Sequence, residues 1–162
     1  MTFRIHSILR RPLPLLGSLA VLLSVAPVVA QSAHFEGITL SAYPPTSSSV
    51  EGRTVGSYAL SNIADSGAGG GLCTGFADTT PDHILTLEND FPSLTVTIDS
   101  GQDTTLLIQG PNDNTVRCGQ DISRSNLDAQ VSGSNWAAGA YRVWVGSHDQ
   151  GQRFDYTLTV TE

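Results

Sequence analysis

The chain has 162 residues, of which 8 are basic and 15 acidic, giving a formal net charge of −7. All the basic residues are arginines, and there is no lysine. Such an acidic chain repels nucleic acid and anionic lipid surfaces, so neither is an expected partner.

The first 30 residues have the order of a secretory signal peptide. Three arginines precede an apolar run from Leu13 to Val25, and small residues lead up to Ala30. An uncleaved membrane anchor is the alternative, but Pro14 and Pro27 interrupt a stretch that is barely long enough to span a bilayer. We therefore expect cleavage after Ala30 and a secreted or periplasmic protein that has no membrane contact afterwards.

The chain that remains after Ala30 is more acidic than the whole chain, because it keeps all 15 acidic residues but only five of the arginines. It has the size of one ordinary domain. Its two cysteines, Cys73 and Cys118, would meet an oxidising compartment, which predicts a disulfide. Two free thiols or a metal pair are the alternatives, although zinc wants four ligands and the sequence offers no matching histidine spacing.

Residues 31–72 have little pattern. The Pro/Ser stretch Tyr43–Ser49 and the Gly run Gly67–Gly71 are typical of loops, and the segment Arg53–Ile63 could hold one or two short strands.

From Cys73 onward, apolar and polar residues alternate with the period of half-buried strands. The segments predicted to be strands are residues 83–88, 94–99, 106–108, 141–146 and 154–161. Gly, Pro, Asn and Asp gather between them, at 99–103, 110–114, 138–139 and 149–151, as turns require. The pattern predicts an all-β fold, an antiparallel β-sandwich of jelly-roll type.

Three stretches resemble the bacterial pre-peptidase C-terminal domain: Asp103–Pro111, Ala138–Gly146 and Tyr156–Val160. The segment from Cys73-Thr74-Gly75-Phe76 to Pro81-Asp82-His83 is similar to a variant of that family in exported bacterial proteins. The resemblance implies a jelly-roll-like domain over 73–162, with strands from 31–72 able to complete it.

Domains of this family serve as accessory or binding modules beside secreted peptidases, and some bind calcium. This chain departs from the family in two ways. It has no peptidase domain, and Cys118 is followed by Gly119-Gln120-Asp121 with a single Asp where relatives often carry a pair.

Catalytic motifs are weak. The triplets Asp65-Ser66-Gly67 and Asp99-Ser100-Gly101 could supply the two carboxylates of an aspartic protease. The first triplet also resembles the nucleophile loop of trypsin-like proteases, but no histidine sits in a recognisable base motif. Asp, Ser and Gly are common turn residues, so two loop turns are the favoured interpretation and no catalytic residue is predicted.

Acidic residues in the turns offer a possible calcium site. Asp103, Asp113, Asp121 and Asp128 fall between residues 99 and 128, and calcium is held by carboxylate and carbonyl oxygens. Asp113 and Asp121 are the candidate ligands. The alternative is that these are solvated turn residues, and no other cofactor is expected.

Arg142 and Trp144 form the candidate ligand contact. If Tyr141, Val143 and Val145 face the core, Trp144 points outward beside Arg142 and could, with Trp136, contact a glycan or protein. The alternative is that Trp144 covers the second face of the sandwich. The sequence thus predicts an exported, non-catalytic accessory or binding module for an extracellular protein or polysaccharide, with a secreted peptidase among the candidates.

Overall fold

The computed structural model describes residues 32–41, 47–68, 70–113 and 115–162. The predicted signal peptide lies outside the described residues, as do positions 43–46 of the Pro/Ser stretch and Gly69 of the Gly run. Among the described residues, no helix is both long and apolar enough to cross a membrane.

The described chain is all-β, as predicted. Its elements, in chain order, are β1 (Ile38–Leu40), β2 (Ser48–Arg53), β3 (Tyr58–Ala59), the 3-10 turn η1 (Leu60–Asn62), β4 (Phe76–Ala77), β5 (His83–Leu87), β6 (Phe91–Asp99), β7 (Thr104–Gln109), β8 (Val116–Ser123), β9 (Asn126–Trp136), β10 (Gly139–Ser147) and β11 (Asp155–Thr161).

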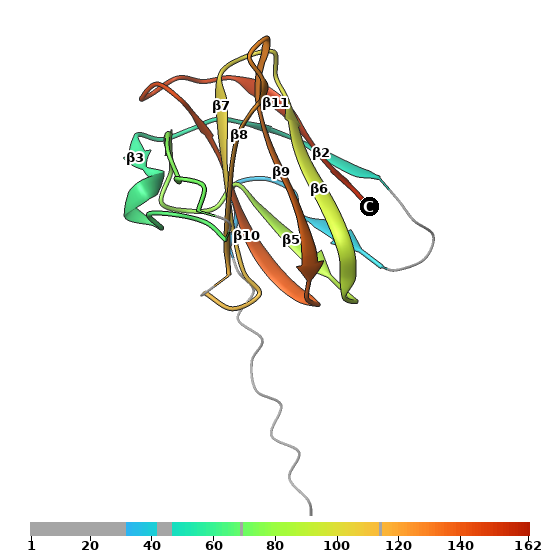
Figure 1. The fold of residues 1–162 in the computed structure, drawn as a ribbon. Coiled ribbons are helices and arrows are strands. Elements are labelled where there is room, and N and C mark those ends of the chain that lie inside the picture. Colours follow the sequence, from blue (N-terminus) through green and yellow to red (C-terminus); the bar gives the residue numbers. More distant parts are fainter. Residues whose placement is uncertain (1–31, 42–46, 69, 114) are drawn as a thin grey trace, which may run out of the picture.

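The strands form two packed layers (Figure 1). One layer has the order β1-β5-β10-β7-β8, with β4 paired to β10 and β3 to β4, and the other has the order β8-β9-β6-β11-β2. All pairs are antiparallel except β1 with β5, which is parallel. The predicted sandwich is confirmed, with one parallel pair that the sequence did not indicate.

Strand β8 belongs to both layers. Its first half pairs with β7, where Leu106 faces Gly119, and its second half, from Gln120, pairs with β9. Gly119 marks the crossing point. A Cβ there would collide with the carbonyl oxygen of Gln130, so the close approach of β9 requires glycine.

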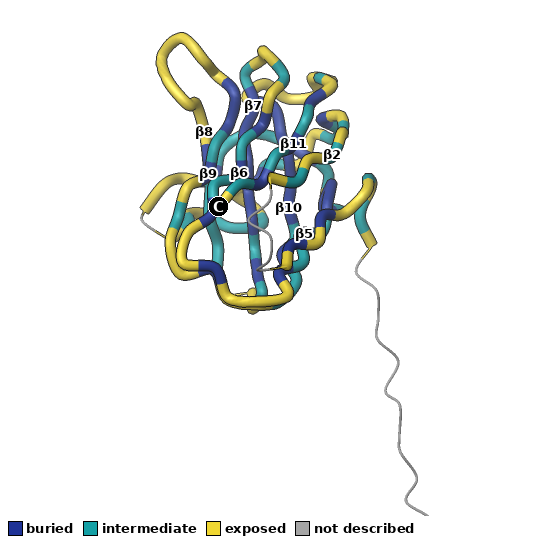
Figure 2. The backbone as a smooth tube through the Cα atoms, turned by 90° about the vertical axis from the view of Figure 1, so that its right-hand side faces the viewer, coloured by how far each residue is buried: buried dark blue, intermediate teal, exposed yellow. Residues whose placement is uncertain are grey.

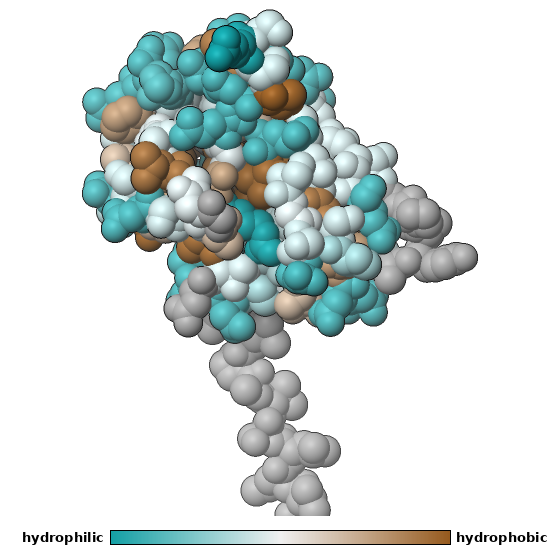
Figure 3. Space-filling model, in the orientation of Figure 1, coloured by the Kyte–Doolittle hydropathy of each residue, from teal (hydrophilic) through white to brown (hydrophobic). Residues whose placement is uncertain are grey.

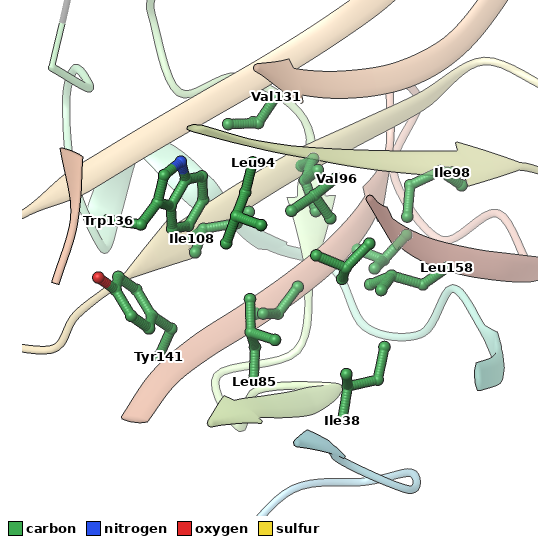
Figure 4. Packing of buried hydrophobic residues seen from close by; sticks show 14 of the residues in the cluster. Ile38, Leu85, Leu94, Val96, Ile98, Ile108, Val131, Trp136, Tyr141 and Leu158 are labelled. Carbon is green, nitrogen blue, oxygen red and sulfur yellow. The ribbon is translucent and has the colours of Figure 1, made fainter. Parts of the chain in front are cut away.

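The core lies between the layers. Figure 4 shows side chains from both sheets pointing toward one another, among them Leu85 and Ile108 from one layer and Leu94 and Leu158 from the other. The alternation predicted over 83–88, 94–99, 141–146 and 154–161 is present, because alternate residues of these segments enter this core: Leu85, Leu87, Leu94, Val96, Ile98, Tyr141, Val143, Val145, Tyr156, Leu158 and Val160.

The expectation for Trp144 as an exposed contact is wrong. Trp144 is 3% exposed and packs in a second apolar cluster with Leu60, Cys73, Ala77 and Leu107, on the outer face of the first layer. The segment from β3 to β4 covers that face, so both faces of β10 are buried. The alternative interpretation, in which Trp144 covers the second face, matches the structure.

Trp136 is also unavailable as a ligand contact, because it is fully buried beside Tyr141, with ring centroids 5.3 Å apart. The Arg117 guanidinium stacks on the Trp136 ring, 4.0 Å from the ring centroid, and donates to the carbonyl oxygens of Ser134 and Asn135. Asn135 has a positive φ of 58°, which turns these successive carbonyls toward Arg117. Burial lowers the pKa of Arg117, although its charge is retained at any physiological pH.

The Pro/Ser stretch is not entirely a loop, which corrects that prediction at Ser48 and Ser49. These residues begin β2, an edge strand whose residues alternate between half-buried and exposed and which pairs along its length with β11. Its polar sequence gives almost no periodic signal, so pairing with an apolar neighbour, rather than its own pattern, makes it a strand.

Candidate functional site: the β8–β9 ribbon

The candidate catalytic residues are not brought together. Asp65 lies in the segment that covers the outer face of the first layer, where its carbonyl accepts from the backbone of Cys73. Asp99 ends β6, in the other layer, beside Thr157 of β11. The structure therefore gives no support for a two-carboxylate protease, and the two triplets lie in loops and strand ends.

The histidines are equally dispersed. Nε2 of His34 lies 3.3 Å from Oδ1 of Asp78. His148 begins the loop after β10. His83 is 1% exposed, with Nδ1 2.6 Å from the carbonyl oxygen of Glu36 and Nε2 2.8 Å from the Tyr156 hydroxyl. Because a carbonyl only accepts, Nδ1 donates to it, and Nε2 of the neutral ring accepts from Tyr156. Burial lowers the pKa of His83, which agrees with a neutral ring.

Asp113 and Asp121, the candidate calcium ligands, lie near opposite ends of β8. Asp113 is in the loop before the strand and pairs at 2.5 Å with Arg142, and Asp121 is exposed beyond the crossing point at Gly119. Across the part of the chain that the structure describes, no group of three or more His, Cys, Asp or Glu side chains could hold a metal ion. The calcium expectation for this pair is thus not supported by their placement.

Arg142 is positioned by polar neighbours rather than presented for a ligand. It donates to Gln109 at 2.9 Å and to Asp113, and its guanidinium lies 5.7 Å from the ring of the buried Trp144. These contacts tie β10 to the loop between β7 and β8. Arg142 and Trp144 are therefore neighbours within the fold.

The exposed apolar residues point to a different place. Four large hydrophobic side chains are exposed in the described chain: Tyr58 at 39%, Leu72 at 66%, and Ile122 and Leu127 at 40% each. Three of these four belong to one region, the end of the β8–β9 hairpin and the loop against it. On the face shown in Figure 3, hydrophobic patches are small and separated by hydrophilic surface. A grouping of three exposed apolar side chains is a candidate interaction surface.

The β8–β9 ribbon, defined here as residues 120–127, projects from the body of the sandwich. Every one of its residues is exposed, and Figure 2 shows the hairpin as a continuous exposed loop beyond the buried strands. Ser123 pairs with Asn126 across the ribbon, and Ile122 and Leu127 are the residues that adjoin this pair on the two strands. Arg124 lies at the turn between them and makes no ion pair with any residue that the structure describes.

Leu72 joins the ribbon through Gln120. The Gln120 side-chain amide donates to the carbonyl of Leu72, at 3.4 Å, and to the hydroxyl of Thr74. The adjoining disulfide between Cys73 and Cys118, predicted from the sequence and present in the structure, anchors this loop to β8. Leu72 is therefore held beside the base of the ribbon.

Asp128 fixes the base on the other side. It is 4% exposed, and its carboxylate accepts from the Ser100 backbone at 2.9 Å, the Ser100 hydroxyl at 2.6 Å and the Gly101 backbone at 3.2 Å. These bonds hold the β6–β7 turn against β9. Asp128, one of the four acidic residues considered for a calcium site, thus accepts hydrogen bonds from the chain itself.

We expect Asp128→Ala to lower the free energy of unfolding by about 3 kcal/mol, because a buried carboxylate and its three charge-assisted hydrogen bonds are lost. Urea denaturation followed by circular dichroism measures the change. Asp121→Ala, on the exposed side of the same hairpin, is the matched control and should stay within about 0.5 kcal/mol. Equal effects of the two substitutions would contradict the anchoring role of Asp128.

Sequence reasoning missed the ribbon. The segment Gln120–Leu127 has neither strict alternation nor a helical period, because a ribbon that is exposed on both faces has no buried side to encode. The only signal was the turn chemistry of Ser123-Arg124-Ser125-Asn126, flanked by Ile122 and Leu127.

Comparisons with known proteins leave the family open. No family model matches the chain, and no curated protein matches it. Among solved structures, the chain is similar to the periplasmic inhibitor of g-type lysozyme, PliG, from Aeromonas hydrophila. That match has a TM-score of 0.41 and 17% sequence identity, and covers 78% of this chain and 97% of that one.

Proposed function

We propose that this protein is an exported binding module that acts without catalysis, and that the β8–β9 ribbon is its recognition element. The observation that carries the proposal is the grouping of Leu72, Ile122 and Leu127 on a projecting hairpin whose base is held by Asp128. Exposing aliphatic side chains to water costs free energy, which binding a partner recovers.

Two further observations support the proposal. The carboxylates and histidines that a hydrolase would need are dispersed or used within the fold, whereas catalysis needs a nucleophile, a base and an orienting group together in a cleft. The Cys73–Cys118 disulfide suits an oxidising compartment, in agreement with the predicted signal peptide. The resemblance to pre-peptidase C-terminal domains stays a prediction, and it also favours an accessory module.

The test uses matched substitutions of equally exposed residues. Ile122→Ser/Leu127→Ser should change the free energy of unfolding by less than about 1 kcal/mol, because both side chains are already solvated. The same double variant should reduce retention of a partner on the immobilised protein at least tenfold, measured by quantitative mass spectrometry of exported proteins from the producing organism. Tyr58→Ser, which alters an exposed side chain outside the ribbon, should leave retention unchanged.

Two results would contradict the proposal. One is retention that falls equally in the Tyr58→Ser variant. The other is hydrolysis of protein, ester or glycan substrates by the purified wild-type protein, if that activity persists through purification and is lost on a single substitution that keeps the fold.

A further inference from the structure

The ribbon end carries an ordered arrangement of charge. Arg124 is at the tip, and carboxylates flank the base on one side: Glu51, Asp99 and Asp155 line a depression across β6, β11 and β2 of the second layer. Ser100 lies in the wall of the same depression and is bonded to Asp128 of β9, which places the depression beside the ribbon. The tip is therefore cationic, and the acidic collar, defined here as Glu51, Asp99 and Asp155, lies along one side of the base.

The collar keeps a net negative charge. Arg53 pairs with Asp155 at 2.5 Å, and this contact lowers the pKa of the Asp155 carboxyl, so one charge of the collar is offset. Neither Glu51 nor Asp99 has an ion pair with any described residue, and Asp121 adds another exposed carboxylate on β8. A partner that covers this end must bring cationic groups to the rim of the contact.

Backbone pairing with a partner strand is disfavoured here. The outer edge of β8 is free beyond Gly119, where β7 stops pairing with it, but the ladder between Asp121 and Ser123 contains a bulge. Bulges and charged side chains are the devices by which proteins protect free strand edges. The ribbon therefore presents side chains rather than its edge.

The alternatives to a protein partner fit less well. A second copy of this chain and an anionic membrane would both be repelled by the acidic collar and by the overall charge. Sugar rings are recognised by stacking on exposed aromatic faces, and both tryptophans, Trp136 and Trp144, are buried. Aliphatic side chains at the ribbon suit a hydrophobic protein cleft.

We propose that the partner is a basic protein with a hydrophobic cleft, into which the β8–β9 ribbon inserts. Ile122 and Leu127 fill the cleft, Arg124 meets a carboxylate at its floor, and the acidic collar meets the cationic rim. This inference rests on the proposed function, because it names the partner of the same ribbon.

The experiment places the photoreactive amino acid p-benzoylphenylalanine at position 122 of the otherwise intact protein, with position 58 as the matched exposed control. Each protein is irradiated with exported proteins of the producing organism, separated beforehand by cation exchange into a basic and an acidic pool. We expect a covalent adduct from position 122 in the basic pool alone, with the cross-linked peptide mapping to a cleft. Position 58 should give no adduct.

Charge reversal at the tip tests the role of Arg124. Arg124→Glu should lower the adduct yield about tenfold, which corresponds to about 1.4 kcal/mol. Thr39→Glu, which adds a negative charge at an exposed position of β1, the far edge strand of the first layer, should leave the yield within twofold. Raising the salt concentration from 0.05 to 0.5 M should weaken the adduct, since exposed charges at the collar become screened.

The outcomes separate the two proposals. An adduct at position 122 in the acidic pool, or with polysaccharide or anionic lipid vesicles added in place of protein, would overturn the basic partner and keep the ribbon as the recognition element. Equal yields for Arg124→Glu and wild type would likewise overturn it. An adduct at position 58 alone, or at neither position in either pool, would overturn both the partner and the proposed function.

Discussion

We expect the free energy of unfolding of Asp82→Asn to rise relative to that of the wild type as the pH is raised from 4 to 8. The difference between the two proteins should change by about 4 kcal/mol over this range. Asp82 is fully buried immediately before β5, where one carboxylate oxygen accepts from the Val145 backbone at 2.8 Å and the other has no partner among the described residues. Burial raises the pKa of Asp82 from 3.8 to about 7, against the opposing effect of the Val145 hydrogen bond, and nearby Asp78 raises it further.

The direction follows from proton linkage. A carboxyl whose pKa is raised by folding holds its proton in the folded state after the unfolded chain has lost it. Its contribution to stability is therefore fully present below pH 3.8 and is lost as the pH rises to about 7. Asparagine does not titrate, so the variant lacks this loss.

His83 acts in the opposite direction. Its lowered pKa means that its contribution to stability is present above pH 6.5 and is lost as the pH falls below that value. Both proteins keep His83, so the difference between their profiles isolates Asp82. Urea denaturation of both proteins at pH 4, 6 and 8 measures it, and parallel profiles would show that folding does not raise the pKa of Asp82.

Removal of the Cys73–Cys118 disulfide is the second large effect that we expect. The bond closes a loop with a sequence separation of 45 residues. Restricting a loop of that length in the unfolded chain is worth about 4 kcal/mol in the chain-entropy model. For a domain of this size, that corresponds to a fall in melting temperature of roughly 10 °C.

The disulfide prediction is tested by thermal unfolding with and without a reductant. Wild type should melt lower when reduced, and Cys73→Ala/Cys118→Ala should melt low under both conditions, since it has no bond to lose. The outer cluster contains Cys73 beside Leu60 and Trp144, so near-ultraviolet circular dichroism would report whether that packing survives. A wild-type melting temperature that is the same with and without the reductant would contradict the stabilising role of the Cys73–Cys118 disulfide.

Sequence reasoning succeeded where one face of a strand is buried. The alternation at Leu94-Val96-Ile98 and at Tyr156-Leu158-Val160 predicted β6 and β11, because these residues enter the core between the layers. β8 and β9 were missed. Their residues are mostly polar, and the ribbon that they form has no buried side to impose a period.

The predicted ligand contact at Arg142 and Trp144 was wrong for a related reason. Trp144 was predicted to be exposed on the assumption that one face of β10 is exposed to solvent. The loop segment that contains Leu60 and Cys73 covers that face. Coverage by a remote, unpatterned segment cannot be read from the strand itself. Conversely, Ile122 and Leu127 look like ordinary strand residues in the sequence, and only the projection of the hairpin shows that they are exposed.

Amide hydrogen exchange along the β8–β9 ribbon tests the central claim most directly. In the free protein, amides of residues 120–127 should exchange quickly, because the ribbon is exposed on both faces. Adding the basic pool of exported proteins should slow exchange at the ribbon and in the adjoining Leu72 loop, and leave the parallel β1–β5 pair unchanged. Protection at β1–β5 or elsewhere in the sandwich, with the ribbon still exchanging quickly, would contradict the ribbon as the recognition element.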